Sequence, residues 1–95
     1  PYVVRVGLYW VMTYRRVATD SGNSLENDNG DIVRDIYNSN WVFQRQEVLL
    51  TASASRAGNR PHCQLWRGYL ITCWDEWDAV NSRGLGIYMR VEELM

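Results

Sequence analysis

Residues 63–77, CQLWRGYLITCWDEW, decide how this chain can fold. They include both cysteines, three of the five tryptophans and many residues that favour β-strands. If they form one continuous strand, alternate residues face opposite sides of a sheet, and both sides carry large apolar groups. The sequence favours this interpretation, because a single Gly without a neighbouring Asn or Asp is a weak turn signal.

A hairpin is the alternative interpretation of the same residues. A three-residue turn at Arg67-Gly68-Tyr69 could use the positive φ that glycine adopts, and Cys63 would then lie opposite Cys73. In a single strand the two thiols, ten positions apart, would be separated by roughly 33 Å. A disulfide needs Cα atoms within about 7 Å of each other. We therefore predict that the two cysteines are reduced and do not bridge each other.

Composition limits the class of protein. Ninety-five residues correspond to about one domain, 1–95, and 13% aromatic residues predict a core rich in aromatic packing. All ten basic residues are arginines and the net charge is −1, so no overall basic field would attract nucleic acid. No apolar run approaches the roughly 18 residues of a membrane span, and no signal peptide is visible. We expect a cytoplasmic protein that binds no membrane.

The flanking segments add strands and one ambiguity. Residues 2–18 read as one long strand and residues 85–94 as a last strand, each with an apolar face that we expect in the core. The predicted core faces are Tyr2, Val4, Val6, Leu8, Trp10, Met12 and Tyr14 in the first strand, and Leu85, Ile87, Met89 and Val91 in the last. Residues 41–57 fit a helix or a strand almost equally, with a slight preference for a strand.

These patterns predict a mainly β fold. We expect an antiparallel small barrel or strongly curved sheet of about five strands, because long strands coil. The alternative is an α+β fold with one helix at about 41–57.

Few residues suggest chemistry. Asp75 and Glu76 lie between tryptophans, as paired carboxylates do in sugar-cleaving sites, but adjacent strand residues face opposite sides. The carboxylates of residues 19–31 do not have the spacing of a calcium loop, so we expect no metal there. His62, the only histidine, has no nucleophile motif beside it and is expected in an exposed turn. We predict no cofactor and no catalytic residue.

Aromatic and arginine side chains could instead bind a flat ligand. The candidate ligand-binding residues are Trp66, Arg67, Tyr69, Trp74 and Asp75. We expect a homo-oligomeric binding or assembly module, most simply a dimer, with an aromatic-lined cleft that could hold a small molecule. The alternatives are a single-stranded nucleic-acid-binding domain of OB or SH3-like shape, which the net charge disfavours, and a small hydrolase that uses Asp75 or Glu76.

Overall fold

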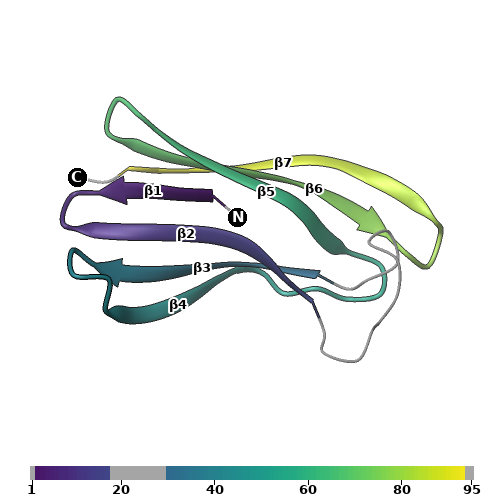
Figure 1. The fold of residues 1–95 in the computed structure, drawn as a ribbon. Helices are drawn as coiled ribbons and strands as arrows, with labels where there is room; N and C mark the ends of the chain where they lie inside the picture. Colours follow the sequence, from purple (N-terminus) through teal and green to yellow (C-terminus); the bar gives the residue numbers. More distant parts are fainter. Residues whose placement is uncertain (1, 18–29, 94–95) are drawn as a thin grey trace.

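Two antiparallel sheets make up the structure, a computed structural model that describes residues 2–17 and 30–93. The first sheet has the strand order β1-β2-β3-β4 and the second has the order β5-β6-β7 (Figure 1). The strands are β1 Tyr2–Val6, β2 Tyr9–Val17, β3 Gly30–Asn38, β4 Phe43–Leu50, β5 Ala57–Trp66, β6 Tyr69–Asp78 and β7 Arg83–Glu93. No helix in the described part of the chain is long and apolar enough to cross a membrane.

The predicted fold class is confirmed in its coarse form. The described residues are mainly β, but they form two stacked sheets rather than a closed barrel, and they contain seven strands instead of about five. The alternative helix at about 41–57 is wrong. Residues 43–50 pair with β3 as strand β4, and residue 57 begins β5.

Two tight turns replace the two long strands that we expected. Residues 2–18 are divided by a two-residue loop at Gly7-Leu8, where Gly7 has a φ of 61°. Residues 63–77 form a hairpin whose two turn residues, Arg67 and Gly68, have φ values of 49° and 82°. Positive φ at both central residues is typical of a type I′ turn, which matches the twist of the flanking strands. The single-strand interpretation is therefore wrong.

The hairpin register also differs from the alternative that we considered. Trp66 pairs with Tyr69, so Cys63 lies opposite Thr72 and His62 lies opposite Cys73. Both cysteines are free thiols on opposite faces of the second sheet. The thiols are therefore kept apart because they lie on opposite faces of the hairpin, and not because they are distant along one strand.

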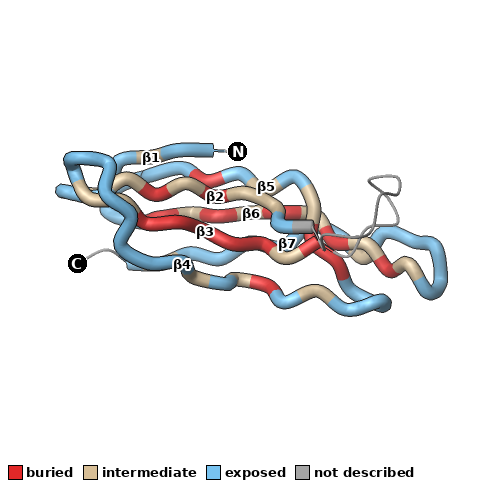
Figure 2. The backbone as a smooth tube through the Cα atoms, turned by 60° about the horizontal axis from the view of Figure 1, so that its bottom comes forward, coloured by how far each residue is buried: buried red, intermediate tan, exposed pale blue. Residues whose placement is uncertain are grey.

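The sheets pack closely at one place. β5 lies across β1, β2 and β3, and the buried segments of Figure 2 follow β3 and β6 through the middle of the sandwich. Ile32, Leu50 and Trp74 form the apolar core. A Cβ atom on Gly58 would lie only 2.4 Å from a side-chain carbon of Ile32. Glycine at position 58 therefore allows β5 to approach β3.

The expected core faces are largely reversed. On β2 the buried residues are Val11 and Thr13, whereas Trp10 is only partly buried. On β7, Ile87, Met89 and Val91 are strongly exposed. The two-residue turn at Gly7-Leu8 pairs Val6 with Tyr9, so even-numbered residues before the turn share a face with odd-numbered residues after it.

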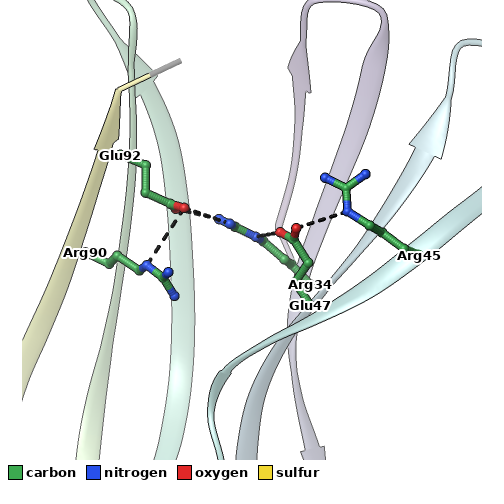
Figure 3. A network of polar contacts seen from close by, with 5 residues as sticks. All are labelled: Arg34, Arg45, Glu47, Arg90 and Glu92. Atoms are coloured by element: carbon green, nitrogen blue, oxygen red, sulfur yellow. Dashed lines mark hydrogen bonds and ion pairs between the residues drawn. The ribbon is translucent and has the colours of Figure 1, made fainter. Parts of the chain in front are cut away.

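Polar groups, rather than the apolar residues that we expected, occupy much of the interior. The side chain of Arg34 on β3 is only 8% exposed and bridges the two sheets (Figure 3). Its Nη1 and Nη2 atoms donate to the two carboxylate oxygens of Glu92 on β7, at 2.6 and 2.8 Å. Its Nε donates to Glu47 on β4 at 2.7 Å. Arg45 and Arg90 add weaker contacts to the same carboxylates.

Removal of Arg34 should destabilise the fold strongly. Arg34→Met leaves two partly buried carboxylates without their shared cation, which commonly costs about 3–5 kcal/mol. Urea unfolding at pH 7 measures the change. Arg16→Met is the matched control, because the Arg16 side chain that pairs with Asp31 is 45% exposed and its loss should cost at most about 1 kcal/mol. Equal losses in the two variants would contradict a structural role for Arg34.

The same network predicts a pH dependence. The hydrogen bonds from Arg34 hold the pKa of Glu92 below its ordinary value. Burial raises the pKa of Glu47, but hydrogen bonds from Arg34 and Arg45 outweigh it, so that pKa is also lowered. A carboxyl with a lowered pKa in the folded state stabilises the fold above its unfolded value of about 4.3 and loses this contribution as the pH falls further.

The stability difference between the native protein and Arg34→Met should therefore shrink as the pH falls from 7 to about 3, through the range in which both carboxylates become protonated. Urea unfolding across this range tests the expectation. A difference that stays constant with pH would show that the ion pairs do not carry the effect of Arg34.

Candidate functional site

The outer face of the second sheet is the candidate site. The strand registers place its side chains in rows across the sheet. Gln64, Ile71 and Val91 form one row. His62, Cys73 and Met89 form the next. We call the apolar part of this surface the outer strip, which consists of Trp66, Ile71, Cys73, Ile87, Met89 and Val91.

A shallow hollow lies at the β5 side of this face. Its volume is about 410 Å³, and it is lined by His62, Gln64, Trp66, Ile71 and Cys73. The Tyr2 ring of β1 packs on His62 with ring centroids 3.9 Å apart and so borders this side of the sheet. The lining is mostly apolar with one imidazole and one amide, which suits contact with an apolar group better than with an ion.

The predicted ligand-binding residues are only partly brought together. Trp66, Arg67 and Tyr69 meet at the β5–β6 hairpin, where the Arg67 guanidinium lies 5.1 Å from the centre of the Trp66 ring. Asp75 lies further along the same face, and its carboxylate accepts a hydrogen bond from Arg60.

Trp74 must be removed from the candidate site. Its ring is buried between the sheets, where its Nε1 donates to Glu76 at 2.7 Å. The prediction failed because the two-residue turn places even-numbered residues of β5 and odd-numbered residues of β6 on one face. Trp66 and Trp74 therefore face opposite sides of the sheet.

The two carboxylates considered for hydrolysis are held apart. Glu76 is buried on the inner face and binds the guanidinium of Arg56 through both of its oxygens. Asp75 lies on the outer face beside Arg60. Two acids on opposite sides of one strand cannot act on the same bond.

The described residues contain no group of three or more His, Cys, Asp or Glu side chains that could hold a metal ion. Most of the carboxylate-bearing loop at 19–31 lies outside these residues. The carboxylate of Asp31 at its end accepts hydrogen bonds from Arg16 and from the backbone N–H of Ala52.

Sequence reasoning missed the exposure of β7. Ile87, Met89 and Val91 are 81%, 66% and 54% exposed, more than the half-buried Ile71 and Cys73 of the central strand. Apolar exposure on this face therefore increases toward the edge of the sheet. The regular alternation of Ile87, Met89 and Val91 was visible in the sequence, but such a pattern does not indicate which side of the strand faces water.

A second aromatic cluster, also missed, lies on the outer face of the first sheet. Trp41 adopts a φ of 63° and stacks on Trp10 with ring centroids 4.7 Å apart. Tyr37 and Phe43 complete the cluster. The side chain of Asn38 accepts hydrogen bonds from the backbone of residues 40 and 42 and so holds this turn. The stacking of Trp41 on Trp10 joins the turn between β3 and β4 to strand β2. The cluster therefore stabilises the β3–β4 hairpin.

Comparison with known proteins adds no function to this geometry. No family model, no curated protein and no solved structure matches the chain.

The thiols provide a test of the two sheet faces. Cys73 borders the hollow, whereas Cys63 is only 3% exposed, and burial raises the pKa of its thiol. We expect one thiol of the native protein to react readily with an aromatic disulfide reagent and the other to react only after unfolding. Cys73→Ser should abolish the fast phase and Cys63→Ser should leave it. Two fast phases would contradict the assigned faces.

Proposed function

We propose that this chain is a homo-oligomeric assembly module and that the β7 side of the outer strip forms its contact with a second copy. The observation that carries the proposal is the row of apolar side chains on β7, Ile87, Met89 and Val91, which nothing in the described residues covers. Proteins that act as monomers rarely leave contiguous apolar patches larger than a few hundred Å².

The shape of the molecule supports the proposal. The principal extents are 41 × 27 × 15 Å, and the radius of gyration is 14.1 Å. A compact chain of this length would have a radius of gyration of about 12 Å. A thin plate buries little of its own surface, because almost every strand has one face in water. Two-fold dimers are the commonest soluble oligomers, and a second copy that meets β7 would remove part of its apolar side chains from water.

A ligand-binding role has less support. The hollow beside Trp66 could accept the apolar part of a small molecule, but the two polar side chains that line it, His62 and Gln64, are exposed and are therefore poorly placed to fix a ligand. The nucleic-acid alternative relies on Trp66, Arg67 and Tyr69 at the β5–β6 hairpin, and the net charge of −1 disfavours binding to a polyanion. The expected cytoplasmic location stays a prediction.

Light scattering after size exclusion tests self-association. At tens of micromolar, we expect twice the chain mass of 11.1 kDa. Met89→Arg should shift the protein to monomers, because a desolvated charge at the contact raises the dissociation constant by about tenfold or more. Leu8→Arg is the matched control, since Leu8 is also apolar and 71% exposed but lies on the β1–β2 turn.

The control variant should keep the mass of the native protein. A native protein that stays monomeric at these concentrations would overturn the proposal. Equal dissociation by Met89→Arg and Leu8→Arg would show that the outer strip is not the contact.

A further inference from the structure

We infer that the second copy joins along strand β7, antiparallel and across a two-fold axis at Met89, to give one continuous six-stranded sheet. This inference rests on the proposed self-association and specifies its geometry. It follows from a comparison of the four edge strands, since an open strand edge presents unpaired N–H and C=O groups that can pair with another chain.

Three of the four edges carry features that oppose pairing. β1 has only five residues, and its first residue packs on β5. β4 carries the polar run Gln44, Arg45, Gln46 and Glu47, and its pairing with β3 is irregular at both ends. β5 contains Pro61, which has no N–H to donate, and a register shift between Asn59 and His62. Short length, charge, proline and bulges are the usual protections of an edge.

β7 lacks most of these protections. It is the longest strand, with 11 residues, and it contains neither proline nor lysine. Its one irregularity lies where Gly84 and Gly86 meet the end of β6, so that residues 86–93 pair regularly. Within the described residues, its backbone makes hydrogen bonds only in the ladder with β6. β7 carries four charged residues, Arg83, Arg90, Glu92 and Glu93, and Glu92 is paired with Arg34 and Arg90. The outer edge of β7 is therefore regular and open.

The side chains of β7 select a register. Antiparallel pairing places residues of the same face opposite each other. With the two-fold axis at Met89, each Met89 lies opposite its copy and each Ile87 lies opposite Val91 of the second chain. On the inner face, Tyr88 then lies opposite Arg90, a pair suited to a cation–π contact. Every residue of this seven-residue pairing, 86–92, belongs to the regular part of the strand.

Neighbouring registers are less favourable. An axis at Arg90 would place two arginines directly opposite each other, and like charges in that position are destabilising. An axis at Tyr88 would bring Leu85, at the irregular end of β7, into the new ladder. The axis at Met89 avoids both problems and pairs all outer residues of 87–91 with apolar partners.

The symmetry also predicts where assembly stops. A two-fold contact uses the same surface on both copies, so the open β7 edge is consumed in the pair. The edges that remain exposed, those of β1, β4 and β5, are the protected ones. We therefore expect a closed dimer rather than an open fibre.

Cysteine cross-linking tests the register. In a Cys73→Ser background, Met89→Cys should form a covalent dimer under mild oxidation, because directly opposed residues lie within the roughly 7 Å that a disulfide allows. Ile87→Cys is the matched control on the same face of the same strand. In this register the two Ile87 positions are four residues apart along the ladder, about 13 Å, and should not cross-link. A mixture of the Ile87→Cys and Val91→Cys proteins should give a mixed dimer.

The outcomes separate this inference from the function on which it rests. A dimer by light scattering in which Met89→Cys stays unlinked, or in which Ile87→Cys links equally well, would overturn the β7 register and leave self-association standing. A protein that is monomeric in every variant would overturn both. Circular dichroism that matches the native protein, recorded on each variant before oxidation, ensures that the comparison is made between folded chains.

Discussion

The ion pairs of Arg34 are the constraint on which the rest of the structure depends. One guanidinium binds Glu47 on the first sheet and Glu92 on the second, and so joins the sheets at the side where β4 and β7 form their edges. Arginine suits this role because its planar fork binds a carboxylate through two hydrogen bonds. A charged group between two sheets occupies space that apolar side chains usually fill. The apolar core is consequently small, limited to Ile32, Leu50 and Trp74 with the residues around them.

Polar side chains fill much of the space between the sheets, and this explains why large apolar side chains lie on the outside. Threonines, Glu76 and Asp78 share the inner face of the sandwich with Arg34, and the large apolar residues of β7 point outward. A chain with this arrangement can bury the outward-facing apolar residues of β7 only against a partner. The outer strip and the open edge of β7 are adjacent, so a surface with exposed apolar groups lies beside unpaired backbone groups. This coincidence connects the internal packing with the proposed assembly.

The sequence predicted the antiparallel β class because alternation and β-branched residues are local signals. It did not predict which side of each strand is buried. Two-residue turns at Gly7-Leu8 and Arg67-Gly68 reverse the correspondence between odd and even positions, and one missed turn moves every later residue to the other face. Arg67 at a positive φ was not recognisable, because only glycine, asparagine and aspartate signal that conformation clearly. Trp66, Arg67 and Tyr69 do lie together, since they are neighbours in the turn. The ion pairs of Arg34 join residues far apart in sequence and had no local signal.

Hydrogen exchange of the β7 amides at different protein concentrations tests the central claim most directly. Amides of β7 that point away from β6 have no partner in one copy and should exchange rapidly at low concentration. As the concentration rises through the range in which the mass doubles, the amides within 86–92 should become protected, while those at the edges of β1 and β4 remain unchanged. Protection of β7 that does not depend on concentration, or dimerisation without any change at β7, would contradict the account.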